Sequence, residues 1–462
     1  MKNNICALLC IVLLLTTRTV SGQIPPSLMY HFEKTDYLSD VLLTSDGNLL
    51  LTGYAITDTA GYFIAKYSIG GAKIWSHYYR KQNPFWTDYI TGKLLETENG
   101  YFLSAYVHKK GLIRKFSKDG APLWDKVFEL NTSNIPKVEL TCIVQSSQHK
   151  ILAAGSSGKG AGGYSFVYLT MDTDGTNEHL VWSGEPKTQA PVSLIPMHDG
   201  GSFLITNAGK NYSPPDDVFP QAYRMDGAGN VLWDKKMVLP FNASATQCIR
   251  TSDDHLLMIG GGLDSVFIMK MDTFCNPVWI KTAALPGLAS EISMGAVTEK
   301  SNGHLLLSGS LRGSGFNDAS HPLLLETDMN GNLLWAKNMI LDETVSVRVK
   351  TILPLTANHI MWCATGRTGP YYDPAAQNIY LISSDSTGNV SCPFMDTSIT
   401  FHSSGLLYLI DEIPGTYLHS YFITSDDANE IPDATLAEGC PSDLAIPLYI
   451  AMPDLQEASC YP

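Results

Sequence analysis

The 462-residue chain is poor in charge, since Asp, Glu, Lys and Arg make up only 16% of it, and its formal net charge is −14. An acidic surface with few bases repels phosphate backbones and anionic lipids, so neither nucleic acid nor a membrane surface is an expected partner. After residue 22 no apolar run is long enough to span a bilayer. Hydrophobic residues still make up 44% of the chain, which is enough for a large folded core.

The common catalytic and metal-binding motifs are also missing. The sequence contains no G-x-S-x-G motif of serine hydrolases, no H-E-x-x-H zinc motif and no adjacent cysteines. Two acidic turns, around Asp172 and Asp328, resemble calcium loops but lack a closing Glu, so we interpret them as ordinary turns. We expect no metal and no cofactor, and we favour a non-catalytic protein over an enzyme.

The N-terminus has the features of a secretory signal. Lys2 precedes an apolar stretch at residues 5–15, and the small residues at 20–22 offer a cleavage point before Gln23. A buried N-terminal helix is the alternative. We predict that residues 1–22 are a signal peptide and that the mature protein is secreted or held at the cell surface or envelope, without a transmembrane span.

Seven cysteines remain after residue 22, and an odd number leaves at least one without a partner inside the chain. Cys142, Cys248 and Cys363 fall in apolar strand-like segments, where they suit burial as small hydrophobic side chains. A disulfide is possible among the three that follow the repeats: Cys392, Cys440 and Cys460.

A repeated unit of about fifty residues dominates the rest of the sequence. Its marker is a tryptophan that follows a short turn: Trp75, Trp124, Trp182, Trp233, Trp279 and Trp335. Except at Trp182, which follows a longer turn, Asp or Ser stands seven residues before the tryptophan, and Gly or Cys275 stands four before it. A seventh unit keeps Asp385 and Gly388 at the same offsets and carries Cys392 in place of tryptophan. So many matched offsets indicate seven copies of one structural unit.

Each unit reads as four short strands separated by turns. In the first unit, the strand-like runs DVLLT, NLLLTGYA, YFIAKYS and IWSHYY alternate with turn and loop residues. Four antiparallel strands form one twisted blade, and the tryptophan can fill the space between neighbouring blades. Four histidines recur at or beside the first turn of their units, which indicates a role in the turn: His149, His255, His304 and His359.

The fold class that follows is an all-β, seven-bladed β-propeller of four-stranded antiparallel blades. Residues 27–33 look like a fourth strand, so we predict that this N-terminal strand completes the last blade and closes the ring. The alternative is that this segment only links the signal to the domain. The predicted organisation is a signal peptide at 1–22, the propeller at 23–394 and a C-terminal tail or small appended β element at 395–462.

The repeat, of the form DGNLLLTGY…FIAKYSIGGAKIW, resembles those of secreted bacterial β-propellers over about residues 27–394. More distantly, it is similar to the blade repeats of quinoproteins. The resemblance implies a fold and says little about activity, because the same scaffold carries many functions.

The candidate binding surface is the face of the ring that carries the loops between second and third strands. These loops are long in blades four, six and seven, whereas the turns on the opposite face are short throughout. Aromatic rings beside carboxylates and arginine suit sugars or peptide segments. The candidate residues are Tyr212, Asp216, Asp217, Phe219, Arg312, Phe316, Asp318, His321, Arg367, Tyr371, Tyr372 and Asp373. The alternative is that these loops are merely tolerated insertions.

Three functions remain open from the sequence. The first is an exported binding scaffold that recognises a glycan or an envelope protein through the long-loop face. The second is an extracellular polysaccharide hydrolase or lyase with carboxylates in the central funnel. The third is a structural propeller for envelope assembly.

Overall fold

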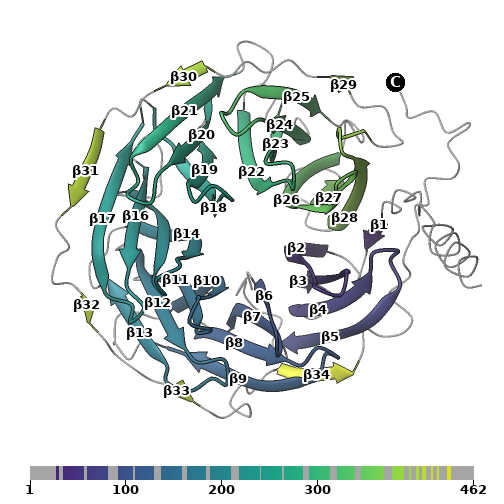
Figure 1. The fold of residues 1–462 in the computed structure, drawn as a ribbon. Coiled ribbons are helices and arrows are strands. Elements are labelled where there is room, and N and C mark those ends of the chain that lie inside the picture. The colour runs from purple at the N-terminus through teal and green to yellow at the C-terminus, as the bar shows by residue number, and fades with distance from the viewer. Residues whose placement is uncertain are drawn as a thin grey trace, which may run out of the picture.

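In a computed structural model the chain forms a ring of seven antiparallel blades around a central axis (Figure 1). Blades seven and one are joined by one parallel bridge, between Gln377 and Thr35. The structure describes residues 28–30, 35–56, 60–81, 92–107, 110–129, 137–158, 164–183, 188–209, 218–239, 241–262, 265–284, 291–312, 320–338, 345–368, 377–389, 395–396, 402–404, 408–412, 418–419, 424–425 and 434–438. Within these ranges no helix has the length and apolar character needed to cross a membrane. The prediction of a seven-bladed β-propeller is confirmed.

Blades one to six each consist of four consecutive strands, ordered from the axis to the rim. Blade one contains β2 (Thr35–Leu43), β3 (Asn48–Ile56), β4 (Ala60–Ser68) and β5 (Lys73–Lys81). Blade two contains β6 (Lys93–Thr97), β7 (Gly100–Val107), β8 (Lys110–Phe116) and β9 (Pro122–Phe128). Blade three contains β10 (Lys137–Gln145), β11 (Ile151–Gly158), β12 (Tyr164–Met171) and β13 (His179–Ser183).

The next three blades follow the same order. Blade four contains β14 (Thr188–Pro196), β15 (Ser202–Gly209), β16 (Phe219–Met225) and β17 (Val231–Val238). Blade five contains β18 (Ser244–Arg250), β19 (Leu256–Gly261), β20 (Ser265–Met271) and β21 (Pro277–Ala284). Blade six contains β22 (Glu291–Glu299), β23 (Leu305–Arg312), β24 (Ser320–Thr327) and β25 (Leu333–Asn338).

Blade seven combines the two ends of the propeller sequence. Its first three strands are β26 (Val345–Thr356), β27 (His359–Thr368) and β28 (Gln377–Asp385), and its fourth is the N-terminal β1 (Leu28–Tyr30). β1 runs antiparallel to β28, with Leu28 opposite Leu381 and Tyr30 opposite Ile379. The predicted closure by an N-terminal strand is therefore confirmed.

Burial explains why the second and third strands of each blade read as nearly continuous apolar runs. Both faces of a blade pack against neighbouring blades, so a middle strand such as β8 is buried at every position after its first. The fourth strand lies at the rim, and in β9 only two of seven residues are buried. The apolar side chains gather in seven clusters, one at each interface between adjacent blades.

A β-bulge near the start of the fourth strand directs the tryptophan inward. In blade one, Lys66 pairs with Trp75 and Tyr67 pairs with Lys73, so Ile74 is the extra residue. Four other blades repeat this register shift, and the five extra residues are all aliphatic and 48–55% exposed: Ile74, Leu123, Leu232, Val278 and Leu334. The bulge thus separates two consecutive apolar residues, one facing outward and one facing the next blade.

The inward tryptophan packs on the turn of the following blade. Gly120 has a φ of +93°, and a Cβ added to it would lie 2.5 Å from Cδ2 of Trp75. A Cβ added to Gly331 or to Gly388 would lie 2.8 Å from the tryptophan of the preceding blade. Glycine is therefore required here both for the left-handed backbone and for space.

Trp182 differs from the other five tryptophans. In blade three, His179 pairs with Thr170 and occupies the place that Trp75 holds opposite Lys66. Trp182 lies three residues farther along and packs against the cluster between blades two and three, on the opposite side of its sheet. The longer turn noted in the sequence shifts the register and produces this difference.

The described parts of the C-terminal tail add a fifth strand to six blades. They are β29 (Met395–Asp396), β30 (His402–Ser404), β31 (Tyr408–Glu412), β32 (Leu418–His419), β33 (Thr424–Ser425) and β34 (Ala434–Glu438). They pair antiparallel with the rim strands of blades six, five, four, three, two and one, in that order (Figure 1). The tail thus follows the circumference in the reverse direction to the blades.

The contact between tryptophan and glycine predicts a specific pattern of destabilisation. Gly120→Ala should lower the free energy of unfolding by about 2–5 kcal/mol, because left-handed strain adds to overpacking against Trp75. Gly47→Ala is the control, since Gly47 has a φ of +76° and open space around its Cβ position. Its free energy of unfolding should fall by only about 1–2 kcal/mol, because only the backbone strain applies there. Urea unfolding measures both, and equal losses would contradict the packing argument.

The tail strands predict a role in protecting the rim. A chain that ends at Asn389 should keep the circular dichroism spectrum of the full chain. It should nevertheless self-associate, because six rim strands would expose unpaired backbone groups. A chain that ends at Glu438 retains all six tail strands and should stay as dispersed as the full chain. Light scattering distinguishes the two. A monodisperse chain ending at Asn389 would contradict this role.

Candidate functional site

The sequence predicts a binding surface at the end of the ring where second strands lead into third strands, which we call the loop face. Tyr212, Asp216, Asp217, Phe316, Asp318, Tyr371, Tyr372 and Asp373 lie outside the described residues. Arg312 and His321 lie on the adjacent strands β23 and β24 of blade six. Phe219 begins β16, two blades away, and Arg367 lies near the end of β27 in blade seven.

Phe219 already has a partner within its own blade. The Nζ atom of Lys236 lies 3.4 Å from the centroid of the Phe219 ring. The two residues come from the neighbouring strands β16 and β17. One face of the ring is therefore covered by a cation, as in a cation–π pair.

A second set of β-bulges lines the axis of the ring. In six blades the register of the first strand skips one residue at mid-length: Ser39, Thr141, Val192, Thr246, Gly295 and Lys350. We call these six residues the bulge ring. A bulge redirects a side chain out of the ladder, here toward the axis.

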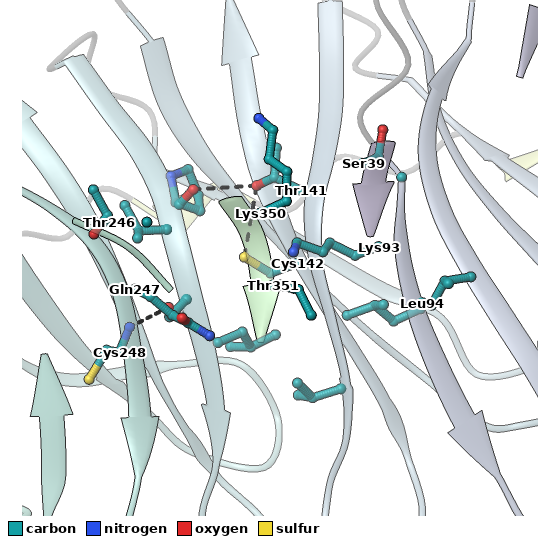
Figure 2. Close-up of a pocket in the computed structure, with 18 of the residues that line it drawn as sticks. Ser39, Lys93, Leu94, Thr141, Cys142, Thr246, Gln247, Cys248, Lys350 and Thr351 are labelled. Carbon is teal, nitrogen blue, oxygen red and sulfur yellow. Dashed lines mark hydrogen bonds between the residues drawn. The ribbon is translucent and has the colours of Figure 1, made fainter. Parts of the chain in front are cut away.

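The bulge ring surrounds a cavity of about 780 Å³, which is within the range of small-molecule sites. All six bulge residues line it, together with Gly92 and Lys93 of blade two. Figure 2 shows Lys350, Thr141 and Thr246 around this space, contributed by separate blades. Described residues from all seven blades thus line this one cavity.

The cavity reaches from the bulge ring toward the loop face. First strands run from the loop face to the opposite face, so Tyr37 lies on the loop side of Ser39. Tyr54, near the end of β3, also lines the cavity, and its ring stacks on that of Tyr37 with centroids 4.1 Å apart. This end of the cavity therefore carries an aromatic pair.

Two lysines line the cavity, whereas no aspartate or glutamate is among its described lining residues. The Nζ atom of Lys93 lies 2.9 Å from Oδ1 of Asp40, and the backbone N–H of Leu94 donates to Oδ2 of the same carboxylate at 2.9 Å. Burial works against the charge of Lys93, but Asp40 outweighs it and raises the pKa of the lysine. Lys93 is thus held as a paired cation.

The two cysteines of the cavity wall are not set up as nucleophiles. Cys142 and Cys248 are buried and form no disulfide. Cys275 and Cys363, elsewhere in the core, are likewise buried and free. Burial raises the pKa of the Cys142 thiol to about 11, so it is protonated at neutral pH. A thiol in that state is a small apolar side chain, since the thiolate is the reactive form.

The acidic turns use their carboxylates to hold their own backbone. Oδ1 of Asp328 accepts hydrogen bonds from the N–H groups of Asn330 and Asn332, and Oδ2 accepts one from the Asn332 side chain. Asp272 and Asp385 do the same in their blades. Across the described ranges, no three His, Cys, Asp or Glu side chains gather in a group that could hold a metal ion.

These carboxylates predict how the protein responds to acid. Partial burial alone would raise the pKa of Asp272, Asp328 and Asp385, but hydrogen bonds from the turn lower it below its ordinary value. A carboxylate whose pKa is lower in the folded state stabilises the fold at pH values above its unfolded-state pKa of about 3.9. This stabilisation is lost as the pH falls from that value through the folded-state pKa. Thermal melts from pH 7 to pH 3 should show a falling Tm below about pH 4.

The triple variant Asp272→Asn, Asp328→Asn, Asp385→Asn is the matching control. It retains side-chain oxygens for the turn amides but has no carboxylates to protonate at these positions. Its Tm should fall less steeply with acid than that of the unsubstituted chain. Parallel curves would show that these turns do not contribute to acid sensitivity.

The sequence did not reveal the bulge ring, because hydrophobic alternation does not mark a single extra residue. A signal exists in the alignment of the first strands. Leu38-Ser39, Leu140-Thr141 and Ala245-Thr246 share a buried apolar residue followed by a hydroxyl residue that is partly or fully exposed.

Comparison with known proteins yields only distant structural similarities. No protein-family model matches the chain, and no curated protein matches it. Among solved structures it is similar to a protein of unknown function from Dyadobacter fermentans, at 11% identity and a TM-score of 0.43, covering 79% of this chain and 99% of that one. A protein of unknown function from Bacteroides caccae matches at 12% identity and a TM-score of 0.37, covering 63% and 93%.

An enzyme is also among the similar structures. An alpha-L-arabinofuranosidase of Fusarium graminearum, in complex with arabinobiose, matches at 14% identity and a TM-score of 0.40, covering 62% of this chain and 90% of that one. These three structures thus resemble the chain only distantly.

Proposed function

We propose that this chain is an exported, non-catalytic binding propeller that admits part of a glycan from the loop face into the central cavity. The observation that carries the proposal is the bulge ring, in which separate blades present side chains to one cavity of small-ligand size. A site built from converging rigid strands is preorganised for binding.

The lining chemistry suits a sugar. Ser39, Thr141 and Thr246 bring hydroxyl groups that can both donate and accept, as sugar hydroxyls require. Tyr37 and Tyr54 add aromatic rings at the loop end, where sugar rings can stack. The long loops predicted from the sequence to bind would then contact the part of the glycan outside the cavity.

Cleavage of a polysaccharide by a hydrolase or lyase that uses carboxylates in the channel receives less support. A glycosidase needs two carboxyl groups about 5–10 Å apart that flank the bond to be cleaved. The described lining of the cavity holds neither Asp nor Glu, and the nearby Asp40 is engaged by Lys93 and by the backbone of Leu94. A non-catalytic role needs no such pair. The resemblance to secreted bacterial and quinoprotein-type repeats is compatible with this role but does not specify it.

The proposal predicts that filling the cavity abolishes binding. Thr246 is exposed inside the channel, so Thr246→Trp can place an indole in the cavity without displacing core side chains. Thr246→Val is the control, because both variants lose the hydrogen bond from Thr246 to the carbonyl of Ile259 but only one fills the space. On a glycan array, the tryptophan variant should lose at least about tenfold in affinity, or 1.4 kcal/mol, and the valine variant less than that.

The loop face is tested in the same assay. The double variant Tyr371→Ala, Tyr372→Ala should also bind more weakly if these loops contact the ligand. A chain that binds no glycan, or one whose binding survives Thr246→Trp, would refute the proposed function. An envelope protein recovered in its place would support the structural role.

A further inference from the structure

Lys350 is the only charged member of the bulge ring. The other five residues are Ser39, Thr141, Val192, Thr246 and Gly295, which are neutral. The bulge in β26 takes Lys350 out of the ladder between Val349 and Thr351, and its side chain is exposed within the cavity. Figure 2 shows Lys350 among the lining residues, with its ammonium group pointing away from Cys142 and Lys93.

Lys350 differs from the other lysine of the cavity in its charged surroundings, as far as the described residues show. Lys93 pairs with Asp40, whereas no carboxylate pairs with Lys350 among the described residues. The charges that act on it are cations, Arg348 on the same strand and Lys93 of blade two. The interior is thus locally positive although the chain as a whole has a net charge of −14.

The surroundings of Lys350 disfavour its positive charge in the absence of a ligand. Enclosure by the protein lowers the pKa of Lys350, and repulsion from Arg348 and Lys93 lowers it further. Its side chain is still open to the channel, so a ligand can reach it. An anion bound there would relieve this repulsion, because opposite charges attract strongly where solvent screening is weak.

We propose that Lys350 is the anchor of an anion-binding subsite and that the ligand is an acidic glycan. The anionic substituent, a carboxylate or a sulfate, would accept hydrogen bonds from the Lys350 ammonium group, while sugar hydroxyls meet Thr141 and Thr246 on other blades. Arg348 lies two residues toward the loop face and is exposed, so it would attract the ligand at the entrance. This inference rests on the proposed function and specifies its ligand class.

The subsite is tested by calorimetry with defined oligosaccharides. The probes are trigalacturonic acid, its fully methyl-esterified form and a sulfated disaccharide. The esterified trisaccharide keeps the sugar and removes the charge. The unsubstituted protein should bind one of the two acidic probes at least about tenfold more tightly than the ester, with an affinity that falls as salt is raised.

Three variants isolate the charge of Lys350. Lys350→Met retains the aliphatic stem and should weaken binding of the acidic probe about tenfold or more, whereas Lys350→Arg should retain it. Lys73→Met removes an exposed charge from the rim and should leave affinity within about twofold, because bulk solvent screens it. Circular dichroism confirms that each variant is folded.

The outcomes separate this inference from the proposed function. Equal affinity for the acidic probes and the ester, or no loss in Lys350→Met, would overturn the anion subsite. If a neutral glycan binds and only Thr246→Trp abolishes it, the cavity binds sugar and the subsite is wrong. If neither the array nor any of the three probes shows binding, the proposed function and the anion subsite are both wrong. Selective loss of the sulfated probe in Lys350→Met would support the subsite and assign sulfate.

Discussion

In five of the seven blades, packing on the next blade depends on one local device, a β-bulge at the start of the rim strand. In blade one it leaves Ile74 exposed and turns Trp75 toward Gly120 of the next blade. Consecutive side chains lie on opposite faces in a regular strand too. The bulge adds a sharper local twist of the rim strand at the tryptophan. Five blades repeat the device, and each repetition fixes how one blade packs on its successor.

The same kind of device serves the axis. A bulge in the first strand is far from the rim contacts, so the residue at this position can change without altering how blades pack. Ser39, Thr141 and Lys350 occupy equivalent places and differ in size and charge. Function can therefore vary at the bulge ring on a scaffold that the rim strands maintain.

The fold could be predicted from the sequence because its signals are local and repeated. The turn at Asp328 and the tryptophan at Trp335 have fixed spacing, and repetition made that spacing visible. The site was harder, because Lys350 and Lys93 are far apart in the chain and meet only when the ring closes. Trp182 illustrates the same limit, since a longer turn changed its register and hence the face on which it packs.

The two chain ends explain why the tail takes its unusual path. β1 occupies the fourth position of blade seven, so the chain that follows β28 has no rim position left in its own blade. It instead pairs with the rim strands of the other six blades, starting with its neighbour, blade six. In rim strands such as β17, the residues that follow the bulge are paired by the tail. Closure of the ring by the N-terminus and coverage of its rim by the C-terminus are therefore consequences of a single strand exchange.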